Sequence, residues 1–358
     1  MNRRQILAAS AGILTLITGI FAVRIFWFSP VPAPPIHTPE TRHLPGQQTK
    51  LSGPYTHKNL TVYLVHGPDA LTGKTPLTLE DAMERKIVVV HETGDVNQLA
   101  VENVSSKDEV YVQAGDIVKG GKQDRVLAVD LIVPALSGRM PIDSFCVEQG
   151  RWTGRGNESS TRFDSSAEYV TSKEMKIAAK HSKSQSQVWN GVAESQEKLS
   201  AATNTNTSSA ASRSSLPLTL ENSRVRADSA EYTKALSRIV EGKPDVIGFL
   251  FAINGEINSS DIYGSSGLFL KLWPKLLKAS AIEAVAESHQ AETRPSGSFP
   301  QPVFEDIEIF FNAAETGPVV ENRSVTDRIR MLTRETKTTV FLESLDDGVL
   351  LHRNYILK

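Results

Sequence analysis

Residues 87–148 read IVVVHETGDVNQLAVENVSSKDEVYVQAGDIVKGGKQDRVLAVDLIVPALSGRMPIDSFCVE, and β-branched and other apolar residues recur through them in short runs. These runs predict strands at residues 87–91, 99–104, 109–113, 125–133 and 140–148. Polar residues and glycines separate the runs over short distances. Because a parallel crossover needs about a dozen residues or more, this spacing favours antiparallel pairing.

The rest of the chain adds helices to these strands. Helices are predicted at residues 77–86, 187–199, 229–240 and 268–287, with Thr78 as a candidate N-cap of the first. Further strands are predicted at residues 60–65, 246–253, 307–311, 338–342 and 349–351, with a hairpin turn at residues 346–348. This order predicts an α+β fold with mainly antiparallel strands and several helices, preceded by an N-terminal transmembrane or signal helix.

Residues 1–28 have the pattern of a signal anchor or a signal peptide. Arg3 and Arg4 precede an apolar, uncharged run at residues 6–23, which as a helix is about 27 Å long and so close to the ~30 Å of a bilayer core. The basic pair favours a cytoplasmic N-terminus, with the rest of the chain on the extracytoplasmic side. No good cleavage site follows the run, which favours a retained anchor over a cleaved signal. We therefore expect a protein of the cell envelope whose first partner is a membrane.

The amino-acid composition predicts how the rest of the chain is divided and argues against some classes of ligand. The proline-rich residues 29–56 are predicted to be an extended linker, and residues 57–358 an α+β domain with a low-complexity, mobile insertion around residues 203–215. The formal net charge of −2 gives no excess of positive charge for binding nucleic acid. One cysteine and eight histidines form none of the usual local zinc motifs, so we expect no metal and no cofactor.

The stretch GDIVKGGKQDR at residues 115–125 is the first candidate site. Gly120 and Gly121 allow positive φ, so consecutive backbone N–H groups can converge on an anion. Lys122 and Arg125 add positive charge, and an arginine offers phosphate two parallel hydrogen bonds. A glycine-rich hairpin with solvated charges explains the same residues, and the chemistry alone favours that interpretation.

The stretch CVEQGRW at residues 146–152 is the second candidate. Cys146 is a candidate nucleophile, with His66 or His91 as a partner in space, although a lone cysteine at a strand end is more often an inert core residue. Trp152 suits stacking on a flat ligand and suits sealing the edge of a core equally well. At residues 264–267 a serine before a helix is expected to cap that helix rather than to bind an anion.

Several blocks together resemble one family, the ARG and rhodanese-phosphatase-superfamily-associated protein domain, which is a bacterial domain family without an established activity. The matching blocks are GGKQDR at residues 120–125, CVEQGRW at 146–152, QVW at 187–189, AINGE at 252–256 and LWPKLL at 272–277. The resemblance covers roughly residues 60–287, with weaker traces to His352, and residues 159–215 look diluted by polar insertions.

The resemblance implies a phosphorylated or ADP-ribose-like ligand, because the family name points to association with ADP-ribosylglycohydrolases and phosphatases. On this hypothesis Asp124 and Glu148 are the acid/base residues if there is chemistry at all, and the ligand-binding residues are Gly120, Gly121, Lys122, Gln123, Arg125, Arg151 and Trp152. The alternative is a non-catalytic structural or interaction module displayed on the outer side of a membrane. An open cleft shared by the two stretches would favour the first hypothesis, and a closed salt-bridge network would favour the second.

Overall fold

The computed structural model describes residues 40–43, 49–288 and 299–358, and this part of the chain is an α+β fold with mostly antiparallel strands, as predicted. The helix predicted within residues 1–28 lies outside the described residues. Within the described ranges, no helix has the length and the apolar character that crossing a bilayer requires. The membrane segment therefore stays a prediction.

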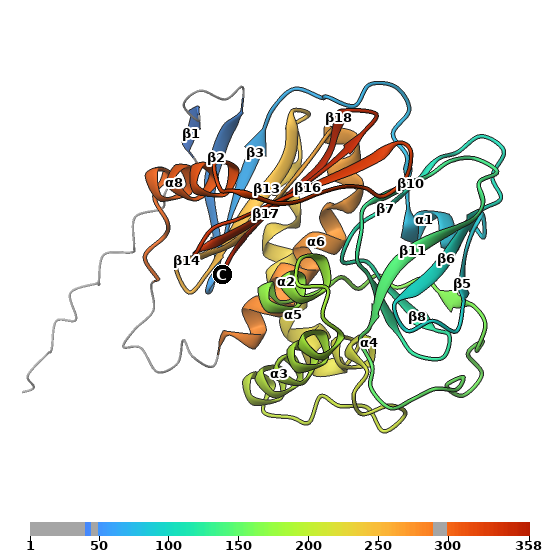
Figure 1. The fold of residues 1–358 in the computed structure, drawn as a ribbon. Helices are drawn as coiled ribbons and strands as arrows, with labels where there is room; N and C mark the ends of the chain where they lie inside the picture. Colours follow the sequence, from blue (N-terminus) through green and yellow to red (C-terminus); the bar gives the residue numbers. More distant parts are fainter. Residues whose placement is uncertain (1–39, 44–48, 289–298) are drawn as a thin grey trace, which may run out of the picture. The chain divides into compact units, whose positions relative to one another are not determined.

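The largest sheet has nine strands, and every neighbouring pair in it is antiparallel. Its strands, in spatial order, are β1 (Glu40–His43), β2 (Lys50–His57), β3 (Leu60–His66), β13 (Val246–Ile253), β14 (Glu256–Tyr263), β18 (Val349–Leu357), β17 (Thr339–Asp346), β16 (Ile329–Glu335) and β15 (Val319–Ser324) (Figure 1). Sequence neighbours β17 and β18 pair as a hairpin, but β18 also pairs with β14. The last strand thus lies inside the sheet rather than at its edge.

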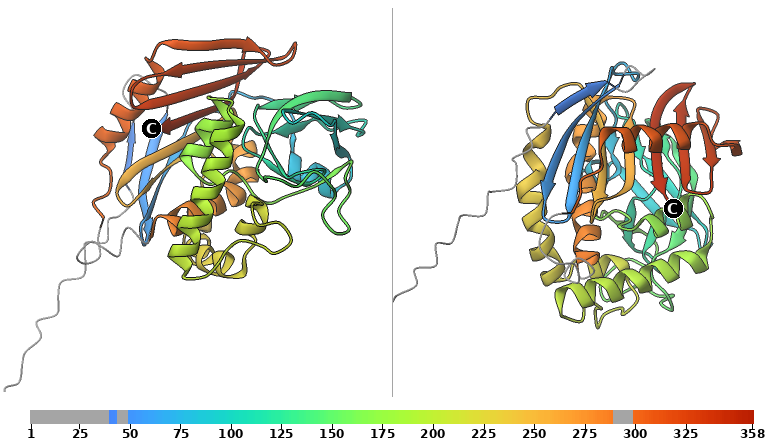
Figure 2. Two further views of the ribbon diagram at one scale, coloured as in Figure 1. Left: turned by 60° about the horizontal axis from the view of Figure 1, so that its bottom comes forward. Right: turned by 90° about the vertical axis from the view of Figure 1, so that its left-hand side faces the viewer.

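Helices cover both faces of the nine-stranded sheet (Figure 2). One face and its helices share a large apolar core, and these helices are α2 (Lys173–Lys180), α3 (Gln185–Thr203), α4 (Leu216–Leu220), α5 (Ser223–Leu236) and α6 (Ser266–Ala286). The short 3-10 turn η1 (Ser237–Val240) follows α5. On the other face α8 (Phe304–Glu315) buries Ile307, Phe310 and Phe311 in a second core.

A second sheet has six antiparallel strands and carries the candidate site. Its strands, in spatial order, are β12 (Phe163–Asp164), β8 (Ile117–Gly120), β9 (Arg125–Leu127), β11 (Gly138–Cys146), β6 (Gln98–Asn103) and β5 (Val88–Glu92). An antiparallel bridge joins His91 to Arg162, and the Glu92 N–H donates to the Thr161 carbonyl at 3.0 Å. These contacts bring the outer strands together, so the sheet closes on itself as a small barrel.

A three-stranded sheet and one short helix complete this half of the fold. The sheet comprises β10 (Leu131–Val133), β7 (Val110–Val112) and β4 (Leu77–Thr78), and α1 (Leu79–Glu84) follows β4 directly. Thr78 caps α1 as predicted, because its hydroxyl accepts the Asp81 N–H.

A buried polar cluster joins the barrel side of the molecule to the nine-stranded sheet. His352 of β18 places Nδ1 3.0 Å from Asp130 Oδ2 and Nε2 3.0 Å from Asp261 Oδ1. Asp130 lies between β9 and β10, and its carboxylate also accepts the hydroxyls of Tyr111 and Ser344. Both ring nitrogens of His352 face carboxylates, so both must carry a proton, and the ring is an imidazolium.

Several predicted elements are confirmed by the structure. The strand at residues 246–253 is β13 with the same bounds. The amphipathic helix at residues 187–199 lies within α3, which buries Val188, Val192 and Leu199. The turn at residues 346–348 is the β17–β18 hairpin, and Ser265 caps α6.

Two strand predictions are wrong. Residues 307–311 belong to α8, whose buried residues recur with the helical spacing of 307, 310, 311 and 314 rather than alternating as in a strand. Residues 125–133 form two strands, β9 and β10, because residues 128–130 leave one sheet for the other.

The linker prediction is wrong for residues 50–56, which belong to β2 and pair with β3. Pro54 is accommodated because the β2–β3 register shifts between Ser52 and Tyr55, and a bulge needs no N–H donor at that position.

The polar segment at residues 204–215 forms no regular helix or strand, but side chains attach it to its surroundings. Thr207 is buried and its hydroxyl lies 2.9 Å from Ser200 Oγ of α3. Ser214 Oγ donates to the Gln149 carbonyl, and Ser215 Oγ donates to Asp124. The composition of this segment did not predict these attachments.

Candidate functional site

The two candidate stretches meet at one end of the barrel. β8 and β9 form a hairpin, in which Gly120 ends β8 and Gly121 begins the turn. Arg125 of β9 pairs with Cys146 of β11, so the residues that follow β11 lie beside the hairpin turn. The Asp124 N–H donates to Glu148 Oε2 at 3.0 Å, which connects the two stretches directly.

The glycine pair is required by backbone geometry and by packing. Gly120 has φ +108° and Gly121 has φ +53°, and a Cβ at Gly121 would lie 2.3 Å from the Phe163 ring. The backbone N–H groups of the turn do not converge on one point, because each donates to a different acceptor within the chain. Gly120 donates to Asp124 Oδ1 (2.9 Å), Gly121 to the Arg162 carbonyl (3.1 Å) and Lys122 to Glu92 Oε2 (3.1 Å).

Glu148 and Arg151 form a closed pair at the centre of the site. Glu148 is fully buried, and Arg151 donates to its two oxygens through Nε and Nη2, each at 2.7 Å. The same guanidinium donates to the carbonyls of Gly120 and Gly121 at 3.1 Å. One arginine therefore holds the glycine turn to the second stretch.

Asp124 is also fully buried and has a complete set of donors. Its Oδ2 accepts Arg155 Nη1 at 2.8 Å and Ser215 Oγ at 2.7 Å. Burial lowers the pKa of Arg155, but the hydrogen bonds that Arg155 donates to Asp124 and the charge of that carboxylate outweigh burial, so the Arg155 pKa lies above its ordinary value. A proton-transfer role for Asp124 or Glu148 would require this network to open first.

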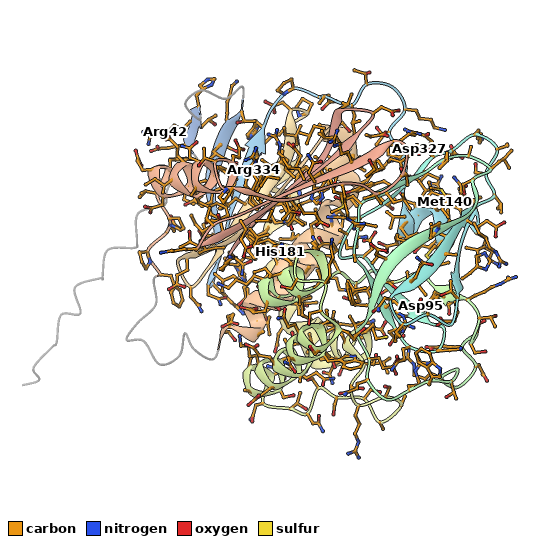
Figure 3. All side chains as sticks on the ribbon, viewed as in Figure 1. Arg42, Asp95, Met140, His181, Asp327 and Arg334 are labelled. Carbon is orange, nitrogen blue, oxygen red and sulfur yellow. The ribbon has the colours of Figure 1, made fainter. Side chains whose placement is uncertain are left out.

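Trp152 is the exposed residue of the site, and the half-buried Lys122 lies beside it. Trp152 is 44% exposed, and Lys122 Nζ lies 5.2 Å from the centroid of its ring. Among the residues that the structure describes, the Lys122 ammonium makes this ring contact and pairs with no carboxylate. The neighbouring loop after β5 is marked in Figure 3 by Asp95, and Nζ would be 3.5 Å from a Cβ added at Gly94 of this loop.

Arg125 and Gln123, two further predicted ligand residues, are buried. Arg125 has no exposed surface, and its Nη1 donates to the Gln123 carbonyl at 3.1 Å. Its Cζ lies 5.8 Å from the centroid of the Trp152 ring. As the structure stands, a ligand in solvent can reach Lys122 and Trp152 but not Arg125.

Three residues of the network were not expected from the sequence. Glu92 accepts the N–H groups of Gly94 and Lys122, while Arg155 and Ser215 bind Asp124. They lie 30, 31 and 91 residues from their partners in the site. A local sequence motif does not predict contacts between residues so far apart in the chain.

Cys146 has the surroundings of an inert core residue. It is fully buried, and burial raises the pKa of its thiol to about 11. The two candidate histidine partners are bonded elsewhere, His66 to Ser52 and Asp245 and His91 to Glu102. A nucleophilic role, which needs the thiolate, finds no support in this geometry.

In residues 40–43, 49–288 and 299–358, no three His, Cys, Asp or Glu side chains are arranged to hold a metal ion. The site is instead a barrel end in which a closed network of carboxylates and arginines supports an exposed tryptophan and a half-buried lysine. The chain belongs to the family described as the ARG and Rhodanese-Phosphatase-superfamily-associated Protein domain, whose model matches residues 48–356. No curated protein and no solved structure matches the chain.

Proposed function

We propose that this domain is a non-catalytic binding module for a phosphorylated ligand that carries a planar ring, such as ADP-ribose or a related nucleotide. The observation that carries the proposal is the exposed Trp152 ring with the Lys122 ammonium beside it, which pairs with no carboxylate of the described residues. An aromatic ring stacks on a nucleobase for about 1–3 kcal/mol, and a lysine binds phosphate as a point charge. Ligand sites also occur often at the mouths of small barrels.

The closed network supports binding rather than catalysis. Asp124 and Glu148 are fully buried, and arginines occupy their oxygens. A general acid or base must come within hydrogen-bond reach of the proton that it transfers. These carboxylates instead hold the hairpin turn and the second stretch in place beneath Trp152.

Calorimetric titration with ADP-ribose, AMP and ribose 5-phosphate tests the proposal. We expect AMP to bind more tightly than ribose 5-phosphate, by the stacking energy of about 1–3 kcal/mol. Lys122→Ala should weaken both by about ten-fold. Lys337→Ala, at an exposed lysine of the β16–β17 turn, is the matched control and should change nothing. If no phosphorylated ligand binds the wild-type chain, the alternative of a structural or interaction module takes the place of this proposal.

We also propose that residues 1–28 hold the domain at a membrane, with the domain on the extracytoplasmic side. The support is the basic pair at Arg3 and Arg4, the apolar run at residues 6–23 and the lack of a good cleavage site. The full chain should fractionate with membranes, and a chain that begins at residue 48 should not. Recovery of a soluble mature protein whose first residue lies beyond Phe28 would contradict the retained anchor.

A further inference from the structure

Arg125 has an empty hydrogen-bonding edge. It has no exposed surface, and within the described part of the chain its Nε and Nη2 atoms have no hydrogen-bond partner. Buried polar atoms are nearly always paired, and those of a charged group above all. This edge therefore requires an explanation that packing alone does not provide.

Two other arginines of the chain show what this edge normally does. Arg151 places Nε and Nη2 on the two oxygens of Glu148, each at 2.7 Å. Arg328 does the same with Asp346, at 2.9 Å and 2.7 Å. In both pairs one planar group with two oxygens fills the Nε–Nη2 fork, which is the geometry that guanidinium groups offer carboxylates and phosphates.

The nearest carboxylate does not fill the fork of Arg125. Glu92 Oε2 lies 3.7 Å from Nη2, which is beyond hydrogen-bond distance. The Glu92 oxygens accept the backbone N–H groups of Gly94 and Lys122 instead, at 3.0 Å and 3.1 Å. Among the described residues, the Lys122 ammonium pairs with no carboxylate, and the Arg125 guanidinium has only this long contact to Glu92.

Trp152 lies close to the same guanidinium group. The centroid of its ring is 5.8 Å from Arg125 Cζ and 5.2 Å from Lys122 Nζ, and 44% of the residue faces solvent. A partly exposed side chain can change rotamer without opening a core. One partly exposed ring thus contacts both the buried guanidinium with its unfilled fork and the Lys122 ammonium.

We infer that Trp152 covers an anion site, and that a ligand moves this ring aside to place two oxygens on Nε and Nη2 of Arg125. The inference rests on the proposed binding function and adds its anchor residue and its cover. The ligand group is a phosphate or a carboxylate, since both present two oxygens to the fork. Lys122 supplies the second positive charge at the entrance, and the displaced ring remains available to stack on a base.

Inorganic phosphate and acetate test the cover separately from ring stacking. Trp152→Ala removes the cover and keeps the fork, so it should bind the preferred anion at least ten-fold more tightly than the wild-type chain does. Arg125→Lys in the Trp152→Ala background keeps the charge but loses the fork, and the gain should disappear. An unchanged affinity in Trp152→Ala would overturn the inference, even if ADP-ribose binds the wild-type chain.

Modification by phenylglyoxal, mapped by mass spectrometry, gives a second readout that needs no change at Arg125. Arg125 should be unreactive in the wild-type chain, reactive in Trp152→Ala, and protected again by the bound anion. Arg139, which is exposed, should react in every sample and serves as the internal control. If Arg125 stays unreactive in Trp152→Ala, the ring is not its cover and the inference fails.

Discussion

Arg151 and Lys122 carry the same charge at the same end of the barrel, but their surroundings differ. Arg151 donates hydrogen bonds to both oxygens of the buried Glu148, whereas Lys122 contacts the exposed ring of Trp152. Removing one partner of a buried ion pair costs about 3–5 kcal/mol, because the other charge stays buried. We therefore expect Arg151→Ala to lower the free energy of unfolding by about this amount, measured by urea denaturation.

Lys122→Ala is the matched variant, and it should change the free energy of unfolding by less than about 0.5 kcal/mol. Equal effects of the two substitutions would mean that the Arg151 network is open to solvent. Arg125 belongs with Arg151 in this respect, since it is buried. Replacing Lys122 and Arg125 together should therefore lower stability through Arg125.

For single residues, the sequence predicts which residues belong to the site, but it does not predict which residues they bind. Two short motifs containing Asp124 and Glu148 predicted one polar site, and the structure brings them into direct contact. Their pairing with Arg155 and Ser215 depends on how the intervening chain returns to the barrel end. Spacing along the chain carries no information about such a return.

Among the elements, α8 offers the sharpest test. Ile309 is 67% exposed, while Phe311, two residues later, is 2% exposed. In a strand these two side chains would share a face, but in a helix they point in different directions. Ile309→Lys should leave the melting temperature nearly unchanged, and Phe311→Ala should cost about 3–5 kcal/mol by opening a cavity in the second core. Similar losses from both variants would contradict the helix.

The wrong prediction for this element has a physical origin. Isoleucine and phenylalanine favour strands by local propensity, and residues 307–311 contain four of them in five positions. The helical spacing becomes visible only when Ala314 is included in the window. By contrast, β13 was predicted with its bounds because a long apolar run ends at a turn, residues 254–255.

At the scale of the whole molecule, the imidazolium of His352 joins the two halves of the fold. Burial lowers the pKa of this ring, but the charges and hydrogen bonds of Asp130 and Asp261 outweigh burial and raise it from 6.5 to about 9. A raised pKa gives stability that is fully present below pH 6.5 and is lost as the pH rises towards 9. Burial lowers the pKa of Lys180 to about 8. Above that pH the folded chain holds this proton less tightly than the unfolded chain does, so Lys180 raises the free energy of unfolding as the pH rises.

The window from pH 6.5 to pH 8 therefore isolates His352. We expect the free energy of unfolding to fall there by about 1.4 kcal/mol per pH unit, measured by urea denaturation at half-unit steps. His352→Gln should be less stable throughout and should lack this slope. If the variant keeps the slope of the wild-type chain, the pH dependence comes from other groups.

The fold class was predictable from the sequence, but the arrangement of the sheets was not. Short spacings between strands indicate antiparallel pairing, and this holds for all neighbours in the two larger sheets. The insertion of β18 between β14 and β17, and the closure of the barrel through His91 and Arg162, depend on contacts between distant parts of the chain. Such contacts depend on how all elements pack together in the core, and a local sequence pattern does not predict them.

The position of β18 makes the nine-stranded sheet depend on residues 349–357. Strands β15, β16 and β17 attach to the rest of the nine-stranded sheet through β18 alone. A nascent chain that has not yet released residues 349–357 from the ribosome leaves β14 as an open edge, and open edges invite wrong pairing and attract chaperones. A chain that lacks these residues thus exposes a strand edge that the folded sheet keeps paired.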